Sequence, residues 1–287
     1  MAEPTTSKKT AKYGDWESPI SQDLVTSGSK SLSEPRVSAN GRIFFLESRP
    51  DGSRTIIEVT DGGTEVRDIL PASYSASNSV YTYGGSAYAA LSDGRLVFSN
   101  SDSSVNILDP DTGAVKRLTG DPVLRYSNFS ANHVNSWVLA IQEDHTIDHP
   151  TGVINRIVAI HADSGEVKTV LEGADFYYPP EYSDDGTKFA WLEWDHPDQP
   201  WFAARLYYAA IDGDAKPGSH HLVAGGLLHG VAEPRWGPDG SLFFGMELTN
   251  YRQLFRLRPD EKNAQQVTSS PDLAEAEFAE LYWRPGR

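Results

Sequence analysis

The chain has 287 residues and no cysteine, and 40 acidic against 25 basic residues give it a net charge of −15. This charge disfavours nucleic acid and anionic membrane surfaces as partners, and the lack of cysteine excludes disulfides, thiolate catalysis and Cys-ligated metal sites. Apolar runs are too short to span a bilayer, so we expect a cytoplasmic protein with no membrane segment.

The N-terminal part contains a polar stretch, residues 1–12, which we interpret as a disordered tail before a single domain over residues 13–287. After it, QDLVTSGSKSLSEPRVS at 22–38 matches HHLVAGGLLHGVAEPRWG at 220–237. In the later copy the apolar residues read as the last strand of a repeat. We therefore expect a strand near 22–26.

An internal repeat follows. SEPRVSANGRIFFL, YYPPEYSDDGTKFAWL and VAEPRWGPDGSLFFG share a Glu-containing strand, a turn with Gly, and an apolar strand. The turn recurs at Gly41, Gly94, Gly186 and Gly240, and a degenerate copy turns near His133. Each unit continues with a third strand, an Asp-Gly turn and a short fourth strand. Four strands in each of five units predict the blades of an all-β propeller.

The C-terminal segment PDLAEAEFAELYW, 271–283, has helix-forming composition, and we expect a loop with one helical turn leading into a strand. AEFAELYWRPGR matches VAEPRWGPDG, so that strand would begin a sixth unit. We predict a β-propeller of five four-stranded blades plus a partial sixth, in which 22–26 and 279–284 pair to close the ring. A chain cut from a longer propeller is the alternative.

Several segments resemble the N-terminal propeller of the prolyl oligopeptidase family, above all its acylaminoacyl-peptidase-like and dipeptidyl-aminopeptidase-like members. They are YGDWESPISQDLV (13–25), VYTYGGSAY (80–88), LRYSNFS (124–130), QEDH (142–145), the tryptophan-rich 173–201 and EPRWGPDGSLFF (233–244). The resemblance implies a propeller that caps an α/β-hydrolase carrying a Ser-Asp-His triad. This sequence has no Gly-x-Ser-x-Gly nucleophile elbow, so we expect no peptidase activity from it alone. Tyr81 and Thr82 stand where the family usually has His-Glu.

Loop lengths predict which face carries the function. With blade strands named A to D, the A–B and C–D connections are tight Asp-Gly turns, whereas the D–A and B–C loops are longer and open on the other face. The B–C loops of units 3 and 4, EDHTIDHPTG (143–152) and EWDHPDQPWF (193–202), place imidazoles beside carboxylates, a combination that exchanges protons near neutral pH. The candidate catalytic residues are His145, His149, Glu193, Asp195 and His196. The candidate substrate-binding residues are Tyr81, Tyr126, Tyr177, Tyr178, Trp194, Trp201 and His229.

Structural interpretations compete with these roles. Asp195-His196-Pro197 and Asp148-His149-Pro150 are also typical of turns in which Asp accepts backbone N–H bonds. The histidines lack the spacing of a rigid metal motif, so we expect no metal and no cofactor. The strand tryptophans are expected in the core, and the recurring A-strand glutamates Glu34, Glu181, Glu233 and Glu280 are expected to be structural.

Three functions from different classes remain open. The first is a propeller that binds a small hydrophobic molecule on its loop face, with a cofactor-independent cyclisation, dehydration or isomerisation in natural-product biosynthesis as its candidate reaction. The second is a non-catalytic module that binds a separately encoded hydrolase or a peptide on the same face, or a second copy of itself. The third is the substrate-gating propeller of a longer peptidase. In none of the three do we expect nucleic acid or a membrane as partner.

Overall fold

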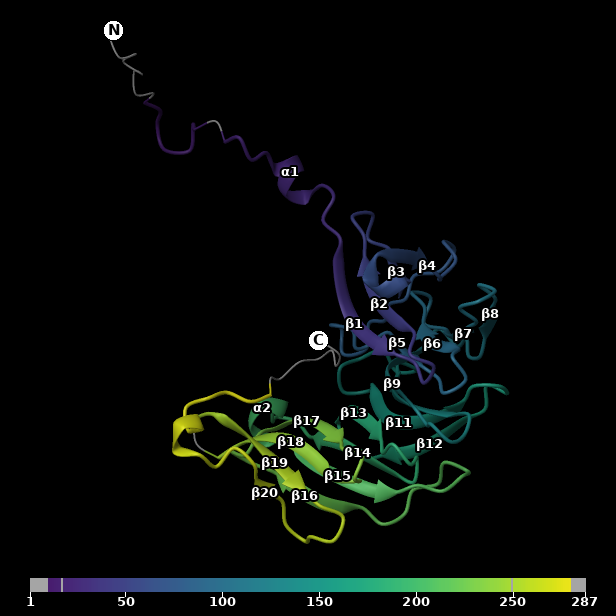
Figure 1. The fold of residues 1–287 in the computed structure, drawn as a ribbon, viewed down its shortest axis with the longest axis vertical. Helices are drawn as coiled ribbons and strands as arrows, with labels where there is room; N and C mark the ends of the chain where they lie inside the picture. Colours follow the sequence, from purple (N-terminus) through teal and green to yellow (C-terminus); the bar gives the residue numbers. More distant parts are fainter. Residues whose placement is uncertain (1–9, 17, 249, 280–287) are drawn as a thin grey trace.

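The computed structural model describes residues 10–16, 18–248 and 250–279. This part of the chain forms five four-stranded antiparallel sheets, and each sheet uses four strands that are consecutive in sequence (Figure 1). The prediction of an all-β fold with five four-stranded blades is thus confirmed. Within these residues, no helix is long and apolar enough to cross a membrane.

The strands of the five blades lie within the predicted repeats. Blade 1 is formed by β1 (Ser31–Val37), β2 (Ile43–Ser48), β3 (Arg54–Thr60) and β4 (Glu65–Asp68). Blade 2 is formed by β5 (Tyr88–Ala90), β6 (Leu96–Ser99), β7 (Val105–Leu108) and β8 (Val115–Arg117). Blade 3 is formed by β9 (Leu124–Ala131), β10 (Trp137–Asp144), β11 (Ile154–His161) and β12 (Val167–Glu172). Blade 4 is formed by β13 (Phe176–Tyr182), β14 (Lys188–Trp194), β15 (Arg205–Ala210) and β16 (His221–Gly225). Blade 5 is formed by β17 (Val231–Trp236), β18 (Leu242–Glu247), β19 (Arg252–Leu257) and β20 (Gln265–Gln266).

The first strand of each blade contacts the first strand of the next, from β1 through β5, β9 and β13 to β17, so the sheets follow one another in an arc (Figure 1). Successive side chains of a strand point to opposite sides of its sheet. On β10, Val138 therefore packs into the cluster between blades 2 and 3, and Leu139 into the cluster between blades 3 and 4. Trp137 and Trp191 lie in the latter cluster, as expected of core residues, whereas Trp236 is half-buried.

The predicted strand near 22–26 is wrong. Residues Gln22–Thr26 form a short helix, α1, because the Ser21 hydroxyl accepts a hydrogen bond from the Leu24 N–H at 3.0 Å and caps its first turn. Leu24 and Val25 are exposed rather than paired with a sheet. Figure 1 shows this segment running away from the blades.

At the C-terminal end, the 3-10 helix η2 (Pro271–Leu273) agrees with the expected single helical turn. Residues 280–287 lie outside the described residues, as do residues 1–9. Because 22–26 is helical, the predicted closure of the ring by pairing this segment with 279–284 lacks its N-terminal strand. The C-terminal strand of the partial sixth blade, the N-terminal tail and the domain boundary at residue 13 stay predictions.

One recurring glutamate has a clear structural role. Glu34 lies at a bulge of β1 with φ of +53°, and its carboxylate is buried against blade 2. There it accepts hydrogen bonds from the Ser86 hydroxyl at 2.8 Å and from the Ala87 N–H at 2.9 Å. Glu34 thus connects two neighbouring blades.

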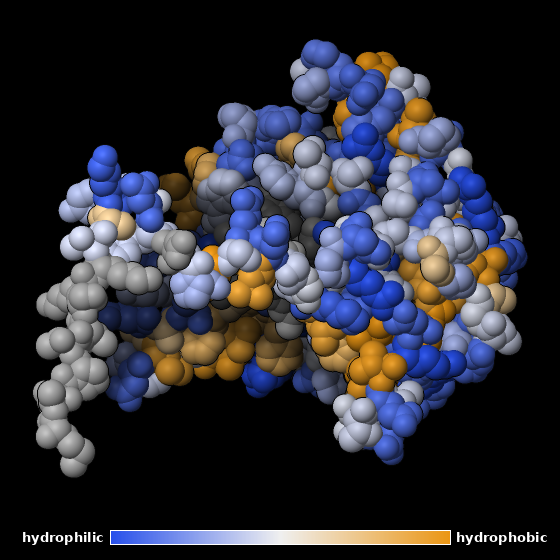
Figure 2. Space-filling view, turned by 90° about the horizontal axis from the view of Figure 1, so that it is seen from above, coloured by the Kyte–Doolittle hydropathy of each residue, from blue (hydrophilic) through white to orange (hydrophobic). Residues whose placement is uncertain are grey.

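The surface seen from above in Figure 2 is mostly hydrophilic, with apolar patches separated by hydrophilic residues. This distribution agrees with the net charge of −15.

Candidate functional site

A cavity of about 1190 Å³ opens among the long loops of blades 2, 3 and 4. We call it the large cavity. Four segments line it. Residues 81–83 belong to the D–A loop before β5, and residues 175–176 lie at the start of β13. Residues 143–155 include the B–C loop between β10 and β11, and residues 194–201 include the B–C loop between β14 and β15. Segments far apart in sequence meet here because adjacent blades project their B–C loops on the same side.

Six of the twelve candidate site residues line the large cavity. They are Tyr81, His145, His149, Trp194, His196 and Trp201. The two longest B–C loops therefore face each other, as their lengths and topology led us to expect. The catalytic and binding roles of these residues stay predictions.

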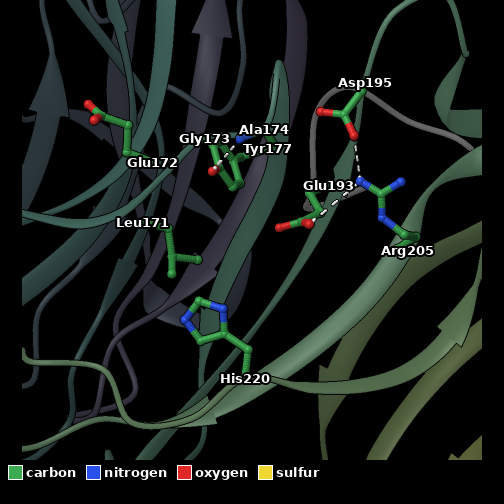
Figure 3. A pocket seen from close by; sticks show the side chains of 9 residues that line it. All are labelled: Leu171, Glu172, Gly173, Ala174, Tyr177, Glu193, Asp195, Arg205 and His220. Atoms are coloured by element: carbon green, nitrogen blue, oxygen red, sulfur yellow. Dashed lines mark hydrogen bonds and ion pairs between the residues drawn. The ribbon is translucent and has the colours of Figure 1, made fainter.

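The structure corrects the placement of Glu193, Asp195 and Tyr177. They line a separate pocket of about 250 Å³ together with Arg205 and His220, which we call the small pocket (Figure 3). Side chains alternate along β14, so Glu193 faces away from the side on which Trp194 lines the large cavity.

Arg205 organises the carboxylates of the small pocket. Its Nη2 atom lies 2.7 Å from Asp195 Oδ2 and 3.6 Å from Glu193 Oε1, as the dashed lines in Figure 3 show. Glu193 also accepts a hydrogen bond from Trp191 Nε1 at 2.9 Å. Both carboxylates are thus held by structural partners and line the small pocket rather than the large cavity.

The remaining candidates, Tyr126, Tyr178 and His229, do not line the large cavity. Tyr126 lies in strand β9, in the core between blades 2 and 3, and its hydroxyl accepts a hydrogen bond from Gln142 Nε2 at 3.0 Å. Tyr178 lies within β13, where burial raises its pKa, and His229 is exposed in the loop before β17. The sequence pattern places Tyr126 and Tyr178 in D–A loops, but β9 and β13 begin early enough to include them.

An imidazole between two carboxylates forms the polar side of the large cavity. His145 Nε2 lies 2.8 Å from Glu143 Oε2, and His145 Nδ1 lies 2.9 Å from Asp148 Oδ1. Burial lowers the pKa of His145, but the two carboxylates outweigh it, and the net effect raises the pKa above its usual value. The hydrogen bond to His145 in turn lowers the pKa of Asp148. This cluster can therefore hold a proton on the imidazole at a higher pH than an isolated histidine does.

Aromatic rings form the opposite wall. Phe176 stacks on Trp194 with ring centroids 5.3 Å apart, and the rings of Tyr81 and His196 meet Phe176 edge-on at 5.5 and 4.8 Å. Trp201, in the short helix α2 (Pro200–Ala203), keeps 44% of its surface exposed at the mouth. The cavity therefore combines an apolar wall with a polar, ionisable one.

Asp195 and Asp175 fix the loop that carries His196. Asp195 Oδ1 accepts the Asp175 N–H at 3.0 Å, and Asp175 Oδ2 accepts the His196 N–H at 2.8 Å. The peptide bond between His196 and Pro197 is cis. For Asp195 the structural interpretation of the Asp-His-Pro turn thus applies.

The candidate set does not include two buried polar residues of the cavity lining. Glu143 and Asn155 occupy paired positions on β10 and β11, and both side chains are buried in the lining. Glu143 was visible in the loop sequence, whereas Asn155 becomes a neighbour only through the register of the hairpin. Among the described residues, no group of three or more His, Asp or Glu is arranged to hold a metal ion.

Neither a known family model nor a curated protein matches the sequence. Solved structures do match. A puromycin-hydrolyzing peptidase of Mycobacterium tuberculosis superposes with a TM-score of 0.82 and 29% identity, over 96% of this chain and 44% of that one. A puromycin hydrolase gives a TM-score of 0.81 and 27% identity, over 97% and 44%.

An oligogalacturonate lyase in complex with manganese matches at a TM-score of 0.65 and 15% identity, over 84% of this chain and 67% of that one, which shows similarity of fold alone. The chain spans less than half the length of the peptidases it matches. The sequence resemblance and the structural match agree: this chain has the structure of the propeller found in peptidases of the prolyl oligopeptidase family.

Proposed function

We propose that the large cavity binds a small molecule with an apolar, partly aromatic body. The observation that carries this proposal is the combination, in one cavity, of the stacked wall of Phe176 and Trp194 with the polar cluster around His145. Small-molecule sites have this composition, because flat apolar walls provide affinity and a few polar groups orient the ligand. The matched peptidases are named for puromycin, which supplies a first aromatic probe.

The polar cluster supports a further, catalytic part of the proposal. His145 lies between two carboxylates at hydrogen-bonding distance, so it is the group best placed to exchange a proton with a bound molecule. A cofactor-independent cyclisation, dehydration or isomerisation would use His145 in this way. A cytoplasmic setting suits a chain without cysteine.

Binding is tested by titrating the protein with puromycin and following tryptophan fluorescence and heat. We expect saturable binding that weakens about tenfold in Trp201→Ala, because the variant loses an aromatic surface at the mouth of the cavity. Trp16→Ala is the matched control, since Trp16 is also an exposed tryptophan but lies before α1, outside the cavity lining. Absence of saturable binding, or equal losses in both variants, would contradict the proposal.

A further inference from the structure

Two buried acceptor atoms of the large cavity lack a hydrogen-bond donor. Glu143 and Asn155 retain only 5% and 6% of their surface exposed, and both line the cavity from paired strand positions. Within the described part of the chain, neither Glu143 Oε2 nor Asn155 Oδ1 accepts a hydrogen bond. A buried acceptor without a donor is unfavourable, so a ligand that supplies donors at this point gains affinity.

The neighbouring contacts hold these two atoms in place. The Tyr81 N–H donates to the other carboxylate oxygen of Glu143, Oε1, at 3.2 Å. The amide nitrogen of Asn155 donates to the Asp175 carbonyl at 2.8 Å, which fixes the orientation of the amide group. Each side chain therefore uses one polar atom for structure, and this leaves Glu143 Oε2 and Asn155 Oδ1 for a ligand.

Arg125, and His145 when it is protonated, lie close enough to Glu143 Oε2 to pair with it electrostatically, but neither makes an aligned hydrogen bond to it. His145 Nε2 lies 2.8 Å away and Arg125 Nη1 lies 3.5 Å away, but neither N–H is aligned for a hydrogen bond to this oxygen. Arg125 Nη1 also contacts the Ser79 carbonyl oxygen at 3.4 Å and is not part of the cavity lining. The carboxylate thus keeps an acceptor position on its cavity side.

The charge of the lining favours a cation. Among the described residues that form it, none is a lysine or an arginine, and four are carboxylates, namely Glu143, Asp148, Asp175 and Asp198. The lining histidines are His145, His149 and His196. An excess of carboxylates with low-dielectric aromatic walls attracts a cationic ligand and stabilises it next to an aromatic face.

We propose that the ligand is a primary ammonium compound whose amine binds between Glu143 Oε2 and Asn155 Oδ1, with its apolar body against Phe176 and Trp194. A primary ammonium has three N–H donors, enough for both oxygens, whereas an acylated or quaternary amine cannot supply them. This inference rests on the proposed function of the cavity and adds the charge and hydrogen-bonding class of the ligand.

The test compares phenethylamine with N-acetylphenethylamine by calorimetry at about pH 8, where the primary amine is still protonated. We expect the wild-type protein to bind phenethylamine at least about tenfold more tightly, and Glu143→Gln to remove this preference. Asp198→Asn, which neutralises another carboxylate of the lining, should retain most of it.

The outcomes separate the two proposals. Equal affinity of the wild-type protein for both compounds would overturn the ammonium inference and leave binding of apolar molecules intact. A preference that persists in Glu143→Gln would also overturn it. If neither compound binds, both this inference and the proposed function fail. The comparison in the wild-type protein needs no variant, so it stays decisive even if Glu143→Gln unfolds.

Discussion

His145 is the cavity residue that lies between two carboxylates and has a raised pKa. It lies 2.8 Å from Glu143 Oε2, the atom proposed to bind the amine, so a protonated imidazole and an ammonium ligand compete for one carboxylate.

The sequence placed His145, His149 and His196 in facing loops correctly. It misplaced Glu193 and Asp195, because the end of β14, and hence the side on which each residue points, cannot be read from the pattern of residues alone.

The competition between protonated His145 and an ammonium ligand for Glu143 predicts that the affinity for the ligand depends on pH. The pKa of His145 is raised above its usual value of 6.5, so the imidazole is protonated at low pH and neutral well above the raised pKa. Asp148 has a lowered pKa and stays ionised throughout. We expect the affinity for phenethylamine to rise about tenfold as the pH increases through the pKa of His145. Calorimetric titrations with phenethylamine between about pH 5.5 and 8.5 measure this rise in affinity.

In His145→Gln the rise should be absent, because glutamine does not titrate. His149 and His196 also line the cavity, so His196→Gln serves as the control and should keep most of the rise. An affinity for phenethylamine that does not change with pH in the wild-type protein, or that increases at low pH, would contradict the proposed competition.

The hairpin turns show how much of each element could be predicted. The recurring turn glycines identified the A–B hairpins, and Gly41, Gly94, Gly186 and Gly240 all adopt positive φ values in the structure. By contrast, residues 22–26 were assigned to a strand by similarity to a later repeat. The cap provided by Ser21 favours a helical turn there instead, and similarity between segments does not report such a local contact.

Gly186 and Gly41 form a matched pair for a stability test. Both need positive φ, at +67° and +82°, but a Cβ at Gly186 would lie 2.3 Å from Asn132 Oδ1, whereas one at Gly41 would meet nothing within 4 Å. We expect Gly41→Ala to lower the free energy of unfolding by about 1 kcal/mol and Gly186→Ala by about 2–4 kcal/mol. Urea denaturation measures both, and equal losses would show that the close approach to Asn132 is unimportant.

At the scale of the molecule, the two faces of the propeller differ. The A–B and C–D turns are mainly polar, although Val134 is exposed in one of them, whereas the D–A and B–C loops contain the large cavity and expose several large apolar side chains. The exposed apolar residues in these loops include Tyr83, Ile147, Trp201, Leu227, Leu228 and Leu248. The Leu228 N–H donates to the Phe202 carbonyl at 2.7 Å, so the loop before β17 lies directly against α2 at the mouth of the cavity.

The blade count and the face that carries the large cavity were predictable from the sequence, because both follow from repeat length and strand direction. The volume and lining of the cavity could not be predicted, because they depend on contacts between residues that are far apart in the sequence. One example is the Tyr81 hydroxyl, which donates a hydrogen bond to the Tyr177 carbonyl oxygen at 3.0 Å. The predicted closure of the ring lacks the strand expected at 22–26, which is helical, and its other strand lies beyond residue 279, outside the described residues. The match to less than half of each peptidase agrees with a propeller unit.

Hydrogen–deuterium exchange with and without phenethylamine tests most directly the claim that the large cavity is the binding site. We expect slower exchange in residues 143–155 and 194–201, which form its walls, and unchanged exchange in the opposite turns at 109–113 and 258–262. Slower exchange confined to 171–174 and 220, around the small pocket, or to the polar turns, would contradict the account.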